Sequence, residues 1–173
     1  MIKTVVIVND DGLFDRLHAT PEIVEDESRV FLEIVLAFLQ RLVQAFTPVG
    51  TTGLLRRSVK TQIFGQRVNL RGEVFTGAET ASYAETIELG RTPGSRMSPK
   101  GVLITWIKRK FGVDEFEAER LEYPVARNIA RFGFFGKPNG FQMFAKALKE
   151  SGNFIENQKK ALGDRIARRT DER

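Results

Sequence analysis

The stretch TPEIVEDESRVFLEIVLAFLQRLVQAF, residues 20–46, has apolar side chains at three- and four-residue spacing along its whole length. This spacing predicts one long helix, with Thr20 as its N-cap and Pro21 at its first helical position. Acidic side chains in its first two turns favour the positive end of the helix dipole. Because several faces are apolar, we expect the helix to pack against more than one surface. It is either the central core helix or a helix shared with a neighbouring subunit.

Strand-like segments lie on both sides of this helix. Residues 2–8 are rich in β-branched side chains and predict an N-terminal strand. Residues 59–64 and 68–75 predict two more strands, joined by a turn at Gly65. The order of segments indicates an α+β fold, in which the long N-terminal helix and C-terminal helices pack on a small, mainly antiparallel sheet. We predict a single domain over residues 1–173.

Further helices are predicted over residues 82–89, 98–111, 114–132 and 141–169. Gly90 follows the first of these and suits the position after a helix C-terminus. Ser98 is the predicted N-cap of the second helix. Pro124 is expected to kink or divide the third, because proline removes one backbone donor. The final residues, 169–173, are expected to be frayed.

Charge is unevenly distributed along the chain, whose formal net charge is +5. Residues 1–50 carry four basic and eight acidic side chains, whereas residues 51–173 carry 23 basic and 14 acidic ones. This asymmetry indicates a solvated surface, head-to-tail complementarity between subunits, or a basic surface facing nucleic acid. The most apolar run, residues 30–39, is too short to span a membrane, and residues 1–10 lack the pattern of a secretion signal.

The composition excludes several kinds of site. The chain has no cysteine, so it has neither disulfides nor a cysteine metal site. His18 is its only histidine, which excludes a histidine cluster, and no serine lies in a nucleophile-elbow context. The Gly133–Lys137 segment lacks the spacing of a phosphate-binding loop. We therefore predict no catalytic, cofactor-binding or metal-binding residue and interpret the chain as a non-enzyme.

Two alternative readings remain open at the level of sequence. The N-terminal strand is followed by Asn9-Asp10-Asp11-Gly12, which resembles the start of the metal-dependent survival-protein nucleotidases over about ten residues. Asp10 and Asp11 would then hold a hard metal ion in a phosphatase, and otherwise form an Asp-rich turn. The basic clusters at residues 108–110 and 165–169 are consistent with solvated helix faces or with a non-specific nucleic-acid-binding module.

Residues 48–58, PVGTTGLLRRS, are followed by a second motif at residues 83–92, YAETIELGRT. In this order they resemble the signatures P-V-D-T-G-x-L-R-x-S and Y-A-x-x-V-E-x-G-T of phage tail-completion proteins, also called minor tail or head–tail joining proteins. Residues 126–141 resemble the family's later I-x-x-x-G and Pro-Phe elements. Relative to shorter family members, residues 98–123 look like an insertion.

The resemblance implies a structural virion protein of a tailed phage, located in the neck or tail and assembled in the host cytoplasm. It implies a homo-oligomeric ring, hexameric at the family level, through which double-stranded DNA passes without sequence recognition. The implied partners are portal, adaptor or stopper proteins on one side and tail terminator or tail tube proteins on the other. No contact with a membrane and no cofactor are expected.

The motif residues have expected structural roles. Pro48 ends the long helix, Gly53 allows an unusual turn, and Leu55 anchors a helical turn while Arg56 and Arg57 face outward. Tyr83, Ile87 and Leu89 are expected to pack on the sheet, and Glu88 to pair with a basic residue of its own or an adjacent subunit. The candidates for fold motif or interface are Pro48, Gly53, Leu55, Arg56, Ser58, Tyr83, Glu88, Gly90, Phe134 and Phe135.

Overall fold

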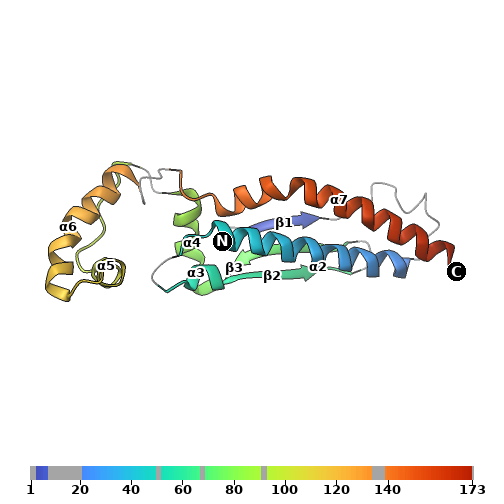
Figure 1. Ribbon diagram of the computed structural model, residues 1–173, viewed down its shortest axis with the longest axis horizontal. Coiled ribbons are helices and arrows are strands. Elements are labelled where there is room, and N and C mark those ends of the chain that lie inside the picture. The colour runs from blue at the N-terminus through green and yellow to red at the C-terminus, as the bar shows by residue number, and fades with distance from the viewer. Residues whose placement is uncertain are drawn as a thin grey trace.

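The computed structural model of the chain describes residues 3–7, 21–49, 52–66, 69–90, 93–133 and 139–172. Its elements are β1 (Lys3–Ile7), α2 (Pro21–Phe46), α3 (Leu54–Arg57), β2 (Val59–Phe64), β3 (Arg71–Thr76), the 3-10 turn η1 (Ala78–Thr80), α4 (Ala81–Leu89), α5 (Ile104–Phe111), α6 (Glu115–Phe132) and α7 (Met143–Asp171). The molecule is elongated: α2, α7 and the sheet form a long body, and α5 and α6 lie beyond one end of it (Figure 1).

The three strands form one antiparallel sheet in the order β1-β3-β2. Val74 of the central strand lies opposite Thr4 of β1 and Thr61 of β2. On β3 the side chains of Val74 and Thr76 are fully buried, whereas Arg71 at its start is exposed. The predicted α+β fold, with long N- and C-terminal helices on a small antiparallel sheet, is confirmed.

Helix α2 is the centre of the core. It packs on β2 and β3 with one side and along α7 with another. Leu32 and Val35 are completely buried, and Leu36, Leu39 and Val43 are nearly so. Across the helix pair, the ring of Phe38 stacks on Phe154 of α7, with centroids 4.0 Å apart. The expectation that α2 contacts more than one surface is therefore met inside a single chain.

Gly72 lets α2 approach the sheet closely. A Cβ atom at this position of β3 would lie 2.7 Å from Cδ1 of Leu36, which is closer than carbon atoms approach one another. Leu36 is only 2% exposed, so its side chain has little room to move aside. The absence of a side chain at Gly72 thus sets the distance between helix and sheet.

Most predicted elements are confirmed, and the start of one helix was wrong. The predicted helix 98–111 begins only at Ile104, and Ser98 is not its N-cap. Residues 99–103 instead form turns, in which Gly101 has a φ of 91° that helical backbone does not allow. Pro124 does not divide the third helix, since α6 is continuous across it. The helix loses one hydrogen bond there, at a position where the proline ring is exposed.

Other boundaries differ by a few residues. The last helix begins at Met143 and continues to Asp171, beyond the predicted frayed start at residue 169. Thr20, the predicted N-cap of α2, lies outside the described residues, as do the turn at residues 9–12 and His18. The single-domain assignment stays a prediction.

Residues 93–133, which we call the arm, form a helical hairpin that closes on itself. Helices α5 and α6 pack mainly on each other, with Ile107 and Ala118 fully buried between them. The buried carboxylate of Glu122 accepts hydrogen bonds from the backbone N–H groups of Gly101 (2.7 Å) and Leu103 (3.2 Å). At the base of the arm, the N–H of Gly94 donates to the carbonyl of Ala130 at 2.7 Å.

The contact between Gly72 and Leu36 predicts that replacement by alanine has opposite effects on stability at Gly72 and at Gly152. Gly72→Ala should lower the free energy of unfolding by about 1–3 kcal/mol, because the added methyl group overpacks the core. Gly152→Ala should raise it by up to about 1 kcal/mol, because Gly152 lies inside α7 with no atom near the new methyl group. Urea unfolding of both variants measures the difference. Equal effects at the two sites would contradict the close approach.

Candidate functional site

The first motif, residues 48–58, surrounds the C-terminal end of α2. The helix ends at Phe46, and Pro48 follows it as expected. Thr47 is buried, and its hydroxyl donates to the carbonyl of Val43 at 2.6 Å and lies 3.2 Å from the sulfur of Met143. The end of α2 thereby contacts the first residue of α7.

Gly53 and Leu55 have their predicted roles. Gly53 stands before the first turn of α3 with a φ of 63°, a left-handed conformation that favours glycine. Leu55 is 5% exposed and belongs to the core. Arg57 is exposed, as expected, and its guanidinium donates to the carbonyl of Thr52 at 2.8 Å.

The prediction that Arg56 faces outward was wrong. Its guanidinium is partly buried and donates to the carbonyl of Thr47 at 3.0 Å. Helix α2 has no basic residue in its own last turn, where the negative end of its dipole lies. Arg56 supplies that positive charge from α3, so its contact fastens α3 to the end of the long helix.

Ser58 belongs to a buried pair of hydroxyl groups. Its Oγ donates to the carbonyl of Leu55 at 2.8 Å and lies 2.6 Å from Oγ1 of Thr80, which also lies 3.1 Å from the carbonyl of Gly77. The carbonyl of Ser58 accepts a hydrogen bond from the N–H of Gly77 at 2.9 Å. These bonds join the start of β2 to the chain that leaves β3, and they satisfy polar groups that burial would otherwise make unfavourable.

Glu88 of the second motif caps α7. The side chain is 6% exposed, and its oxygens accept hydrogen bonds from the backbone N–H groups of Phe144 (3.1 Å) and Ala145 (3.2 Å). A carboxylate is favoured there, because the first N–H groups of a helix lack partners within it and carry the positive end of its dipole. Glu88 therefore binds a helix N-terminus of its own chain, where we had expected a basic side chain.

The backbone supports the same junction. The N–H groups of Phe141 and Gln142 donate to the carbonyls of Ile87 (2.8 Å) and Glu88 (3.2 Å). Gly140 has a φ of 70°, and a Cβ atom there would collide with the backbone of Glu88 and Gly90, so this position requires glycine. Gly90 ends α4 as predicted, with its N–H bound to the carbonyl of Thr86 at 2.9 Å.

Some of the other predicted residues are described by the structure, and others are not. Ile87 is in the core, but Leu89 is 62% exposed, so its predicted packing on the sheet was wrong. Leu89 is the last residue of α4 and lies two positions from Ile87, which turns its side chain away from the buried face. Tyr83 lies in α4, and its side chain is outside the description, as are Phe134 and Phe135 entirely. A role of any of these residues in an interface stays a prediction.

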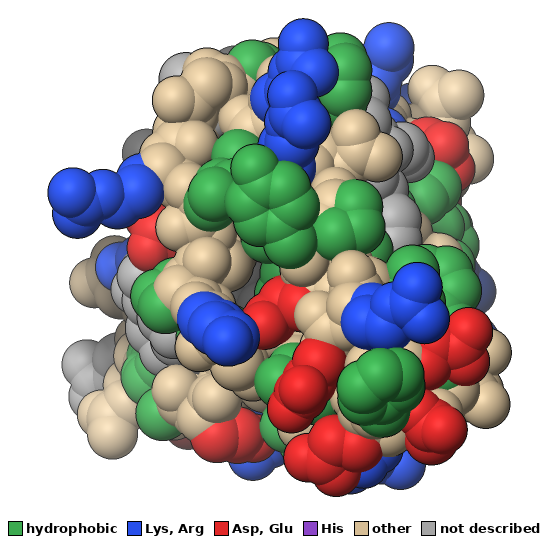
Figure 2. Space-filling model, turned by 90° about the vertical axis from the view of Figure 1, so that its left-hand side faces the viewer, with side chains coloured by type: hydrophobic (Ala, Val, Ile, Leu, Met, Phe, Trp, Pro, Cys, Tyr) green, Lys and Arg blue, Asp and Glu red, His purple; other side chains and the backbone are tan. Residues whose placement is uncertain are grey.

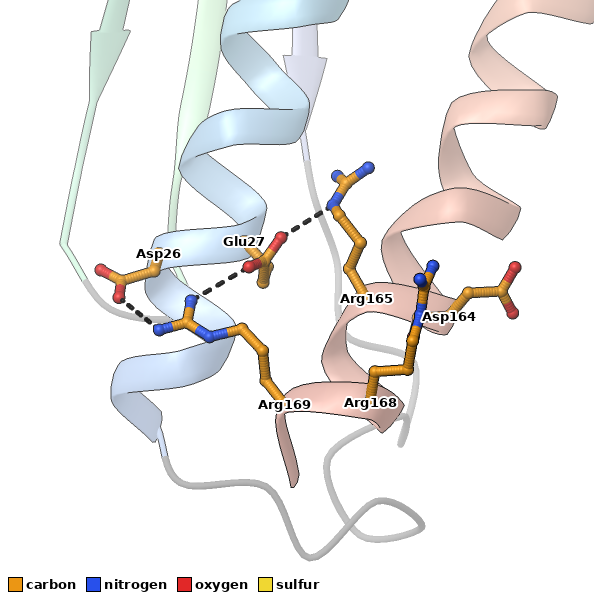
Figure 3. Close-up of polar contacts among 6 residues, drawn as sticks. All are labelled: Asp26, Glu27, Asp164, Arg165, Arg168 and Arg169. Atoms are coloured by element: carbon orange, nitrogen blue, oxygen red, sulfur yellow. Dashed lines mark hydrogen bonds and ion pairs between the residues drawn. The ribbon is translucent and has the colours of Figure 1, made fainter. Parts of the chain in front are cut away.

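At the opposite end of the body, charged side chains join the start of α2 to the end of α7. Glu27 is 8% exposed and accepts from Arg165 at 2.7 Å and from Arg169 at 3.0 Å. Arg169 also lies 3.5 Å from Asp26, whereas Arg168 makes no contact with the two carboxylates (Figure 3). Part of the acidic N-terminal and basic C-terminal charge is thus paired within one chain.

The arginines set the ionisation of Glu27. Burial alone would raise the pKa of this carboxyl group, but hydrogen bonds and positive charges from Arg165 and Arg169 outweigh it, so the pKa lies below its ordinary value of 4.5. The hydrogen bond that Arg169 donates to Glu27 raises the pKa of Arg169. The pattern of the sequence contained a signal for this contact, because Glu27 lies between Val24 and Phe31 on a face of α2 that is otherwise apolar.

In the part of the chain that the structure describes, no group of three or more His, Cys, Asp or Glu side chains is arranged to hold a metal ion. None of the described helices is long and apolar enough to cross a membrane. Asp10 and Asp11, the candidate ligands of the phosphatase reading, lie outside the described residues.

The protein has an α+β fold, in which the motif residues join helices and strands into one body. Residues 11–86 match the family described as "Bacteriophage HK97-gp10, putative tail-component". Over these residues the chain is similar to the HK97-gp10-like family of phage tail components, which confirms the resemblance to phage tail proteins. The match includes α2, both strands of the β2–β3 hairpin and most of α4, and ends before the arm and α7.

Neither the comparison with characterised proteins nor that with solved structures found a match to the chain. The family match supports a structural role as a phage tail component. It gives no support to the phosphatase or the nucleic-acid-binding module.

The capping role of Glu88 predicts a loss of stability when its oxygens are removed. Glu88→Ala should lower the free energy of unfolding by about 1–3 kcal/mol, because two N–H groups at the start of α7 lose their acceptors. Glu88→Gln keeps one oxygen and should lose less. Chemical denaturation measures both, with Glu85→Ala on the exposed face of α4 as a control. A Glu88→Ala variant as stable as the control would contradict the role.

The lowered pKa of Glu27 predicts how stability depends on pH. Its contribution is complete above about pH 4.5 and is lost as the pH falls through the lower value of the folded protein. Glu27→Gln should lower the free energy of unfolding at pH 7 by about 1–3 kcal/mol, because two charge-assisted hydrogen bonds weaken. Denaturation at pH 7 and pH 3 should show this difference shrinking under acid. A difference that stays constant between the two pH values would refute the ion pairing.

Proposed function

We propose that this protein is a ring-forming subunit at the junction between the head and the tail of a phage. The observation that carries this proposal is the family match over residues 11–86, which includes the helix and strands at the centre of the body. The motif residues within and beside that region support it, because they fasten the elements of the body to one another. A subunit with fixed geometry is what a ring of identical copies requires.

The proposed action is binding, with no covalent bond made or broken. Each subunit presents two different surfaces, because closed rings use head-to-tail contacts between identical copies. Six copies would surround a lumen through which double-stranded DNA passes without sequence recognition. One side of the ring would face portal, adaptor or stopper proteins, and the other the tail terminator or tail tube. Such a protein becomes part of the virion after assembly in the host cytoplasm.

Phage that lack the protein should make heads and tails that do not join, or tails that are defective, because the connecting ring is missing. Electron microscopy of particles from a knockout, with and without a plasmid copy of the gene, measures this outcome. The plasmid copy is the control, since it should restore joined, infectious particles. Normal infectious particles without the protein would refute the proposal, as would purified wild-type virions that contain none of it.

A further inference from the structure

Several large apolar side chains of the arm lie outside its small core and are exposed to solvent. Its large side chains exposed to solvent are Met97, Val102, Phe111, Phe116, Tyr123 and Phe132, with exposed fractions between 42% and 70%. Figure 2 shows this end of the molecule, where hydrophobic side chains stand among basic ones and acidic side chains gather below. Exposed aromatic side chains that are concentrated in one hairpin indicate a surface that binds another molecule.

The outer face of α6 combines aromatic and basic side chains. Arg120, Tyr123 and Arg127 follow each other at three- and four-residue spacing, so they share one face, which Arg131 extends by a further turn. All four are exposed, opposite the side of α6 that packs on α5. Neither Arg120 nor Arg127 forms an ion pair within the described residues. We call this face the basic stripe.

The solvent-facing side of α2 has the complementary composition. Glu22 and Glu33 are exposed and form no ion pair among the residues that the structure describes. Val30 and Ile34 on the same side are 42% and 37% exposed. Arg29, the basic residue within this stretch, is paired with Glu25 at 3.3 Å. We call the face from Glu22 to Glu33 the acidic stripe.

The two stripes match in length and lie toward opposite ends of the molecule. Glu22 and Glu33 are eleven residues apart, as are Arg120 and Arg131, so each pair spans about 16 Å of helix. The acidic stripe lies in the half of α2 that pairs with the C-terminal end of α7, whereas the arm lies beyond the other end of the body (Figure 1). One molecule therefore does not join its own stripes, and a second copy offers each stripe its complement.

We propose that the basic stripe of α6 docks antiparallel on the acidic stripe of α2 in a second copy of this chain. In this register Arg120 meets Glu33, Arg131 meets Glu22, and the exposed ring of Tyr123 lies on Val30. The acidic first turn of α6, which includes Glu117, then lies toward Arg41 of α2, and not against the acidic stripe. The contact is head-to-tail, so it deepens the proposed ring function and rests on it.

Charge reversal on each stripe tests the proposal. Arg120→Glu/Arg131→Glu and, separately, Glu22→Arg/Glu33→Arg should each lower the self-association constant at least about tenfold, because attractive pairs become repulsive. An equimolar mixture of the two variants should recover assembly, since the reversed α6 of one fits the reversed α2 of the other. Native mass spectrometry and sedimentation measure mass and affinity. Lys149→Glu/Lys160→Glu, on exposed positions of α7, is a control with the same charge change as the first variant.

Crosslinking provides a second measurement that does not depend on charge. The chain has no cysteine, so Tyr123→Cys in one copy and Val30→Cys in another introduce the only thiols. A short thiol-reactive crosslinker should join these two variants when they are mixed. Tyr123→Cys mixed with Lys160→Cys should give no product above background.

The outcomes separate this inference from the proposed function. If the wild-type protein assembles and folded reversal variants assemble equally well, the stripes are not the contact and the inference fails alone. It also fails if the variants lose assembly but their mixture does not recover it and the cysteine pair does not crosslink. A wild-type protein that remains monomeric at every concentration and salt level would contradict the ring itself.

Discussion

The antiparallel contact between α2 and α7 is the constraint on which the rest of the structure depends. It joins the two longest helices of the chain along their length, and it places the sheet against the remaining buried side of α2. Both ends of the contact carry polar interactions. Thr47 meets Met143 at one end, and Glu27 meets Arg165 and Arg169 at the other (Figure 3).

The apolar and polar parts of this contact have different physical roles. Each fully buried Leu, Ile or Val contributes about 1.5–3 kcal/mol, so the apolar seam of α2 supplies most of the stability. Apolar packing has little directional preference, and helices could slide by a turn with a similar area buried. Glu27 and Glu88 act against such slippage, because each satisfies its hydrogen bonds at one position of α7.

The body and the arm differ in their relation to the family match. The family match lies in the body and covers the α2 helix and the β2–β3 hairpin. The arm lies outside the matched residues and buries only a small core of its own, formed around Ile107 and Ala118. In the contact that we propose, exposed side chains of the hairpin meet a neighbouring copy, while the helices and strands of the body stay packed on one another.

The sequence by itself determined the helices, the strands and the resemblance to phage tail proteins, because these depend on local patterns. Apolar spacing identified α2, alternation identified β2 and β3, and Gly53 and Gly90 marked turns that favour glycine.

Only the tertiary structure decided the partners of the polar residues. Glu88 binds an N–H group 56 positions away and Glu27 an arginine 138 positions away. A contact between residues far apart in the sequence also explains why α5 begins later than predicted. Glu122 of α6 accepts hydrogen bonds from backbone N–H groups in the turn that precedes α5. Hydrogen bonds act over about 3 Å in space and are indifferent to distance along the chain, so local spacing carries no record of them.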